Sequence, residues 1–164
     1  MAESAELIRL AVFGRPVSHS LSPRIHRAFA RQFGLPIDYE AIESGPDTFE
    51  DQLQRLSDRG GRGCNVTVPL KNEAWRHANR ASARADRAEA ANTLTFGEEG
   101  LLAENTDGGG LVADLCRLGA ILESSRVCLI GAGGAAAGVL GALLENAPGL
   151  VVVANRTVER ASAL

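Results

Sequence analysis

The stretch from residue 126 to residue 146 constrains the fold of this chain more than any other. Val127–Ile130 is a short apolar run typical of a buried strand, and the sequence GAGGAA (131–136) follows it at once. Small and apolar residues then continue to about Asn146, and Leu150–Ala154 is a second apolar run. A strand, a glycine-rich turn, a helix and a further strand in this order predict a βαβ unit with parallel strands.

The turn in this unit has the GxGxxA pattern of dinucleotide-binding loops. Gly131 suits the tight turn, Gly133 lets the backbone approach a pyrophosphate, and Ala136 lets the helix pack closely on the strand. The first amides of the helix and its positive dipole end favour a phosphate group. A tight turn that binds no ligand is the alternative. The residues expected to bind a cofactor here are Gly131, Ala132, Gly133, Gly134 and Ala135.

The end of the second predicted strand favours NADP over NAD. NAD-binding proteins place an acidic residue there to accept from the ribose 2′-hydroxyl. This chain has Asn155, Arg156 and Thr157 instead, with Arg160 one helical turn beyond Arg156. A guanidinium group binds a 2′-phosphate with forked donors. Two exposed arginines are the alternative, although a cation in a first helical turn opposes the helix dipole.

The preceding residues, 1–104, alternate between strand and helix signals. Predicted strands are Leu7–Phe13, Ile37–Ile42, Gly63–Val68, Asn92–Phe96 and Leu101–Glu104, and helices are predicted after Ser22–Pro23, at Asp47 and at Pro69. Helical stretches between strands call for a mostly parallel sheet with crossover helices. We therefore predict an α/β fold with a domain boundary near residue 105. Residues 105–164 would form a linker helix, from Thr106 to Leu118, and the first βαβ of a Rossmann-like domain.

That second domain is expected to be incomplete. A doubly wound domain contains two βαβαβ halves, so on the order of 100 further residues are expected.

In the first predicted helix, Ile25, Ala28, Phe29 and Phe33 fall on one face.

Two polar segments of the first domain are candidates for ligand binding. Ser20 and Ser22 are two residues apart, so in an extended segment both hydroxyls would point the same way and could bind a carboxylate. Ser22 could equally cap the following helix. In the predicted strand that ends at Val68, alternation places Asn65 and Thr67 on one face.

Three more polar residues could take part in chemistry. Lys71 lies in the first turn of a predicted helix, where the dipole favours a neutral amine suited to acid–base work. Asn92 stands among small and apolar residues, and Asp107 precedes a helix. A surface lysine and a capping residue (Asn105, Thr106 or Asp107) are the alternatives.

Composition narrows the classes of function. Apolar residues make up 45% of the 164 residues, charged residues 23%, and the net charge is −3, without a basic stripe for nucleic acid. No apolar run approaches the roughly 20 residues of a membrane span, and the N-terminus to Arg9 lacks the apolar core of a signal peptide. Three separated cysteines (Cys64, Cys116 and Cys128) predict reduced, mostly buried thiols in a cytoplasmic protein. With three scattered histidines, among them His19, no metal site is expected.

Taken together, the motifs resemble those of the shikimate dehydrogenase family. The matching segments, in family order, are GRPVSHSLSP (14–23), GCNVTVPLK (63–71), AANTL (90–94), ENTDG (104–108), GAGGAA (131–136) and NRT (155–157). The resemblance implies NADP-dependent reversible reduction of 3-dehydroshikimate to shikimate, with residues 1–104 as the substrate domain. We expect a monomer or a homodimer.

The resemblance assigns roles to the candidate residues. Ser20 and Ser22 would bind the substrate carboxylate, Thr67, Asn92 and Asp107 the ring hydroxyls, and Lys71 with Asp107 would form the catalytic pair. Which of the two transfers the proton stays open. The chain departs from the family at Glu89-Ala90-Ala91, where a glycine and a valine are more usual.

Several alternatives fit parts of the pattern. A quinate or aminoshikimate dehydrogenase is the nearest, but Arg156 and the two serines favour shikimate and NADP. A methylenetetrahydrofolate dehydrogenase would need a different lysine motif. A non-catalytic binding module on the same fold would have no need of both Lys71 and Asp107.

Overall fold

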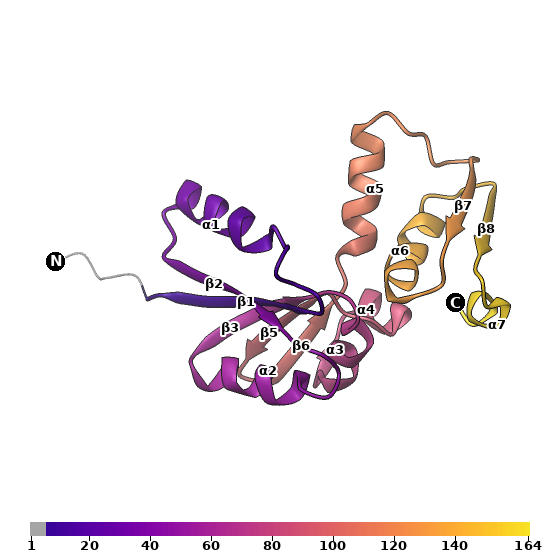
Figure 1. The fold of residues 1–164 in the computed structure, drawn as a ribbon. Coiled ribbons are helices and arrows are strands. Elements are labelled where there is room, and N and C mark those ends of the chain that lie inside the picture. The colour runs from indigo at the N-terminus through magenta and orange to yellow at the C-terminus, as the bar shows by residue number, and fades with distance from the viewer. Residues whose placement is uncertain (1–5) are drawn as a thin grey trace.

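A computed structural model describes residues 6–164 as two α/β units joined by a helix (Figure 1). The first unit contains six strands, β1 (Ile8–Gly14), β2 (Ile37–Glu43), β3 (Gly61–Val66), β4 (Arg80–Ala81), β5 (Thr93–Gly97) and β6 (Gly100–Glu104). Its helices are α1 (Ser22–Phe33), α2 (Phe49–Asp58), α3 (Lys71–His77) and α4 (Ala83–Ala88). The joining helix is α5 (Asp107–Arg117), and the second unit comprises β7 (Arg126–Ile130), α6 (Gly134–Glu145), β8 (Leu150–Ala154) and α7 (Val158–Ser162).

The six strands form one sheet in the order β2-β1-β3-β5-β6-β4. The prediction of a mostly parallel sheet is confirmed, since β1 runs parallel to β2 and β3, and β4 runs parallel to β6. Strand β5 is antiparallel to β3 and β6. The reason lies in the short Gly97–Gly100 connection, because a turn of this length can only join antiparallel neighbours.

The main core lies between the sheet and helix α2. Phe13 of β1 and Phe49 of α2 are fully buried and meet edge to face, with ring centroids 5.6 Å apart. Leu53 and Leu56 extend the same apolar stripe along α2. In Figure 1, α1 covers the opposite face of the sheet, over β1 and β2 only, which leaves that face open beside β3 and β5.

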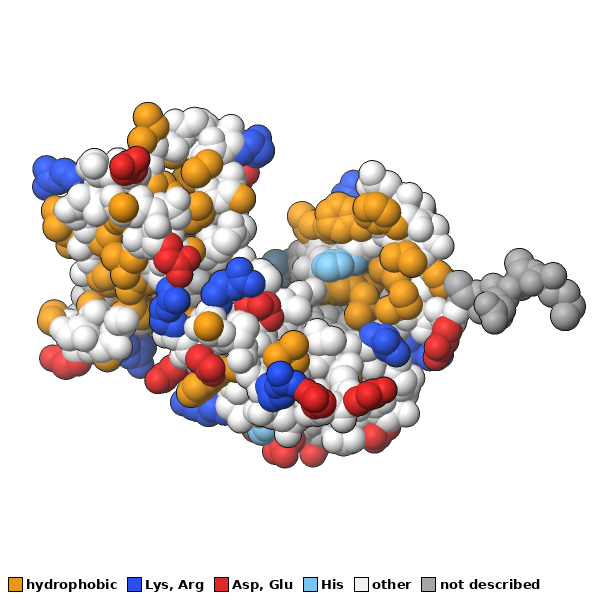
Figure 2. All heavy atoms as spheres, turned by 180° about the vertical axis from the view of Figure 1, so that it is seen from behind, with side chains coloured by type: hydrophobic (Ala, Val, Ile, Leu, Met, Phe, Trp, Pro, Cys, Tyr) orange, Lys and Arg blue, Asp and Glu red, His pale blue; other side chains and the backbone are white. Residues whose placement is uncertain are grey.

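Helix α1 differs from an ordinary amphipathic surface helix. The residues predicted on one face include Ile25, Phe29 and Phe33, whose exposed fractions are 44%, 55% and 71%. Figure 2 shows hydrophobic side chains gathered over this helix. The buried residue of α1 is instead Ala30, which follows Phe29 directly and therefore points about 100° further around the helix.

The second unit is the predicted βαβ. Strands β7 and β8 are parallel and in register from Arg126↔Leu150 to Ile130↔Ala154. Alternate residues along both strands are exposed, so one face of this small sheet is covered and the other is open.

The prediction that the three cysteines are mostly buried is wrong for two of them. Cys64 is buried, but Cys128 lies on the open face of β7 and Cys116 is exposed on α5.

Close contacts through glycine hold the second unit against the first. Helix α6 packs on α4 and α5. A Cβ atom at Gly108 would lie 2.7 Å from the Cβ of Ala142 and 2.8 Å from the carbonyl oxygen of Gly138. At the edge of this contact, Arg87 of α4 donates to Glu145 of α6 at 2.6 Å. Only glycine at position 108 allows the two helices to approach so closely.

Within residues 6–164, none of the helices is both long and apolar enough to cross a membrane. The expectation that the segment up to Arg9 lacks the apolar core of a signal peptide falls partly on residues 1–5, which lie outside the described residues.

Candidate functional site

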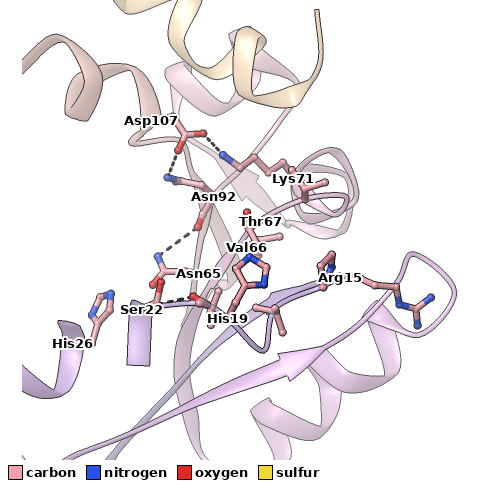
Figure 3. A pocket seen from close by; sticks show the side chains of 15 residues that line it. Arg15, His19, Ser22, His26, Asn65, Val66, Thr67, Lys71, Asn92 and Asp107 are labelled. Atoms are coloured by element: carbon pink, nitrogen blue, oxygen red, sulfur yellow. Dashed lines mark hydrogen bonds and ion pairs between the residues drawn. The ribbon is translucent and has the colours of Figure 1, made fainter. Parts of the chain in front are cut away.

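A cavity of about 670 Å³ opens on the uncovered face of the first sheet, beside the hollow between the two units (Figure 2). Its walls come from the loop after β1, the start of α1, the ends of β3 and β5, and the first residues of α3 and α5 (Figure 3). This volume is within the range of small-molecule sites. The cavity brings together all the residues expected at the substrate site, namely Ser20, Ser22, Thr67, Lys71, Asn92 and Asp107.

The Asp107 carboxylate binds two other polar side chains that line the cavity. The ammonium group of Lys71 forms an ion pair with Asp107 Oδ2, and Asn92 Nδ2 donates to Asp107 Oδ1 at 2.8 Å. Figure 3 shows both side chains pointing toward the carboxylate from different elements. The side chains of Lys71 and Asp107 are only 12% and 22% exposed, so water screens the pair weakly. A lysine and a carboxylate held in contact can exchange or share a proton.

The helix starts explain why these two residues face each other. Lys71 is the first residue of α3 and Asp107 is the first residue of α5. Neither Thr106 nor Asp107 caps α5 with its side chain. Instead Asn105, buried under the helix start, accepts from the Asp107 amide at 3.1 Å and donates to the Ala90 carbonyl at 2.9 Å. Asp107 is therefore free to turn its carboxylate into the cavity.

Ser22 lies at the end of the cavity away from Lys71 and Asp107 (Figure 3), and Ser20 is hydrogen-bonded to it. The capping alternative for Ser22 is wrong, since Ser22 is the first residue of α1 and follows Leu21 at the cap position. The Ser22 amide donates to Ser20 Oγ at 3.2 Å. Ser20 thus takes the local capping role, and the Ser22 hydroxyl lines the cavity.

Asn65 and Thr67 both line the cavity, but so do Val66 and Val68, because β3 ends at Val66 and the chain turns there, so strict alternation does not continue through this segment. Asn65 was not assigned a role from the sequence, although the same alternation was the signal for it. Its Oδ1 accepts from the Tyr39 hydroxyl at 2.7 Å. His26 stacks on the Tyr39 ring, with centroids 4.5 Å apart, and burial lowers the pKa of His26. Figure 3 shows Arg15, also at the rim, pointing away from the group around Asp107.

The glycine-rich loop lies next to this cavity. Gly131 has a φ of 111°, which glycine adopts without strain, and its amide donates to the Ala154 carbonyl at 2.8 Å. A Cβ atom on Gly134 would lie 3.5 Å from Lys71 Cβ. The N-terminus of α6 therefore faces the beginning of α3. A molecule bound on the loop would lie beside Lys71.

The residues expected at a cofactor site are only partly brought together. A second cavity, of about 580 Å³, is lined by Ala132, Gly133, Gly134 and Arg160. Asn155, Arg156 and Thr157 follow β8 at the same sheet edge as the glycine loop, because Ile130 and Ala154 are paired. They, Gly131 and Ala135 are not among the lining residues of this cavity. Arg156 is exposed at the surface.

Two α/β units with a dinucleotide-type glycine loop beside a polar cavity are the arrangement typical of two-domain, nucleotide-dependent enzymes. Residues 12–94 match the family model described as shikimate dehydrogenase substrate binding domain, and residues 116–164 match that of shikimate / quinate 5-dehydrogenase. The chain belongs to the shikimate dehydrogenase family.

Individual relatives agree with this. The shikimate dehydrogenase (NADP(+)) of Aromatoleum aromaticum is 50% identical over 157 residues, which cover 95% of this chain and 56% of the relative. That of Alkalilimnicola ehrlichii is 52% identical and covers 95% and 58%. The crystal structure of shikimate 5-dehydrogenase from Thermus thermophilus in complex with NADP(H) and shikimate is 38% identical, with a TM-score of 0.87, and the match covers 95% of this chain and 59% of that one. The chain thus spans little more than half the length of these relatives.

Proposed function

We propose that this chain carries the substrate site of an NADP-dependent shikimate dehydrogenase, which interconverts 3-dehydroshikimate and shikimate. The observation that carries the proposal is the Lys71–Asp107 pair at one end of the cavity, opposite Ser20 and Ser22 at the other. A ring bearing a carboxylate on one side and a ketone or hydroxyl on the other matches this arrangement. The relative of known structure that holds shikimate and NADP(H) supports this choice of ligands.

The proposed chemistry follows from the charges in the cavity. When a hydride reaches the ketone carbon, the oxygen gains negative charge and needs a proton or a donor beside it. Lys71 and Asp107 supply both, since they share one ion pair that a ligand oxygen can join. We assign Thr67, Asn92 and Asp107 to the ring hydroxyls and the two serines to the carboxylate. Donors held by protein contacts stabilise developing charge without having to reorganise.

NADP would supply the hydride from the side of the glycine loop. Gly131, Ala132, Gly133, Gly134 and Ala135 would hold its phosphates at the start of α6, and Asn155, Arg156, Thr157 and Arg160 would hold the adenosine 2′-phosphate. The place of Gly134 beside Lys71 supports this, because the two ligands must meet at the catalytic pair.

In this proposal residues 1–104 form the substrate-binding and catalytic domain, and residues 105–164 form the linker helix and the first βαβ of the cofactor domain. The three free cysteines support a reducing, cytoplasmic setting. We propose a monomer or a homodimer.

Oxidation of shikimate by NADP⁺, followed as absorbance of the reduced nicotinamide, tests the proposal, with NAD⁺ and quinate in parallel. Turnover that Lys71→Met and Asp107→Asn both abolish supports it. Turnover that survives Lys71→Met contradicts the assigned catalytic pair. Shikimate binding without turnover restricts the proposal to the substrate site, and absence of both contradicts it.

A further inference from the structure

A continuous series of side-chain hydrogen bonds runs beneath the cavity, from β2 to the catalytic pair. The Tyr39 hydroxyl donates to Asn65 Oδ1 at 2.7 Å, and Asn65 Nδ2 donates to Thr93 Oγ1 at 3.2 Å. Thr93 Oγ1 donates to Asn92 Oδ1 at 3.1 Å, and Asn92 Nδ2 donates to Asp107 Oδ1 at 2.8 Å. The series crosses β2, β3 and β5 and ends at the start of α5.

The donors and acceptors in this series have a single consistent direction. The one hydroxyl proton of Thr93 goes to Asn92, so its oxygen is left to accept from Asn65. Asn92 Oδ1 also accepts from the Thr106 amide at 3.0 Å, which a flipped amide could not do. Thr106 thus also holds Asn92, through its amide and its hydroxyl, and Thr93 links the orientation of the Asn65 amide to that of Asn92.

Two members of the series do not line the cavity. Tyr39 is 1% exposed, and it lies under the His26 ring. Burial raises the pKa of Tyr39, so its hydroxyl stays protonated and remains a donor. Thr93 is half-buried and directly opposite Asn65 in the antiparallel β3–β5 pair. Neither can touch a ligand in the cavity, and both touch an asparagine that can.

These hydrogen bonds determine whether the Asn65 amide presents a donor or an acceptor to a ligand. Both Nδ2 protons are used, one by Thr93 and one by the Asn92 carbonyl at 3.4 Å. Tyr39 uses one of the two lone pairs on Asn65 Oδ1. The remaining lone pair is the only free hydrogen-bonding position of this amide, so Asn65 faces the cavity as an acceptor.

We propose that Tyr39 and Thr93 are positioning residues, which fix Asn65 as an acceptor for a ligand hydroxyl and fix Asn92 as the support of Asp107. The ligand part of this statement rests on the proposed function. The orientation of the two amides does not, since it is a property of the chain without a ligand.

Near-isosteric variants test the proposal. Thr93→Val removes the hydroxyl but keeps the branched shape, while Thr93→Ser keeps the hydroxyl. Tyr39→Phe removes the hydroxyl that donates to Asn65 Oδ1. Thr95→Val is the matched control, because Thr95 is an exposed residue two positions further along β5. The readouts are the side-chain amide resonances of Asn65 and Asn92 in ¹H–¹⁵N NMR spectra, and the Kd for shikimate by calorimetry.

Thr93→Val should shift or broaden the side-chain resonances of both asparagines and raise the shikimate Kd about tenfold, as expected for the loss of a hydrogen bond in a partly buried site. Tyr39→Phe should shift the Asn65 resonances more than those of Asn92 and weaken binding similarly. Thr93→Ser and Thr95→Val should remain within twofold of the unaltered chain.

Unchanged asparagine resonances in Thr93→Val and Tyr39→Phe would overturn the proposal, as would a shikimate Kd that stays within twofold of the unaltered chain in both. If Thr93→Val does not fold, Tyr39→Phe decides between the two outcomes. If the unaltered chain does not bind shikimate, the proposed function fails, and the resonances still decide whether the two residues orient the amides.

Discussion

At the scale of single residues, backbone conformation shows where the chain departs from its family. Glu89 ends α4 with a φ of 44°, in the left-handed region. Glycine adopts this conformation without steric cost, whereas other residues are strained there. This is the physical reason why a glycine suits the segment before Asn92, and why Glu89 does not.

Glu89→Gly should therefore stabilise the chain. We expect a gain of about 0.5–1 kcal/mol in the free energy of unfolding, because the relief of strain exceeds the added entropy of the unfolded chain. Urea unfolding followed by circular dichroism measures it. The control is Glu98→Gly, at an exposed glutamate that is outside the left-handed region. Equal losses of stability in both variants would contradict the argument.

Arg156 is the residue that should distinguish NADP from NAD. It is exposed after β8, at the same sheet edge as the glycine loop. Arg156→Ala should weaken NADP⁺ binding about 10- to 100-fold, since forked hydrogen bonds to a phosphate contribute about 1.5–3 kcal/mol. NAD⁺ binding should change by less than about twofold. Calorimetry with both nucleotides measures this, and Arg31→Ala on α1 is the control. An equal loss for both nucleotides would place Arg156 elsewhere than at the 2′-phosphate.

At the scale of elements, the packing of α5 on α6 depends on glycine, and Gly108 is the position on α5 that requires it. A Cβ atom at Gly108 would clash with Ala142 and the Gly138 carbonyl, whereas one at Gly109 would meet nothing within 4 Å. Gly108→Ala should lower the free energy of unfolding by about 1–3 kcal/mol through overpacking. Gly109→Ala should raise it by about 0.5–1 kcal/mol, because alanine favours the helix. Urea unfolding of the two variants compares them directly, and a loss in both would rule out this account of the contact.

The junction between β6 and α5 is held by a charged residue. Glu104 accepts from Arg84, from the Ser82 hydroxyl at 2.7 Å and from the Asn105 amide at 2.7 Å. The Arg84 guanidinium is the largest cause that lowers the pKa of Glu104 below 4.5. A lowered folded-state pKa means that the unfolded chain binds more protons in this range. Stability from Glu104 is therefore complete above about pH 4.5 and is lost as the pH falls through the folded-state pKa.

Glu104→Gln should accordingly be less stable than the unaltered chain at pH 7, by on the order of 1 kcal/mol, because solvent screens the exposed Arg84. The difference should shrink toward pH 3, where Glu104 becomes protonated in the unaltered chain as well. Urea unfolding at several pH values measures it. A difference that stays constant between pH 7 and pH 3 would show that charge is not the cause.

Features set by local interactions could be predicted from the sequence, whereas features set by contacts between distant segments could not. The parallel βαβ from Arg126 to Ala154 was predicted almost to the residue, because periodicity and glycine turns act locally. The exposure of Phe29 and Phe33 on α1 was not, since burial depends on what packs against a helix. Tyr39 and Thr93 gave no signal either. Each is an ordinary strand residue, and only the pairing of distant strands connects them to Asn65.

At the scale of the whole molecule, the two units meet where α6 packs on α4 and α5 and where the glycine loop lies beside Lys71. The motifs predicted a polar cavity and a glycine loop separately. That the loop lies beside Lys71 depends on how α6 packs on α4 and α5, and no local pattern specifies such a contact. The cavity residues themselves come from β1, from the loop after it, from β3 and from the helix starts at Lys71 and Asp107. The first and the last of them in the sequence, Val12 and Asp107, are 95 residues apart.

A titration of the ¹⁵N-labelled chain with shikimate, followed by ¹H–¹⁵N NMR, tests whether the cavity binds this ligand. Saturable shifts are expected in both halves of the cavity at once, near Ser22 and near Asp107, and they should weaken in Ser22→Ala, which removes a hydroxyl assigned to the carboxylate. Shifts that do not saturate, that fall outside the cavity, or that are unchanged in Ser22→Ala would contradict the proposed substrate site.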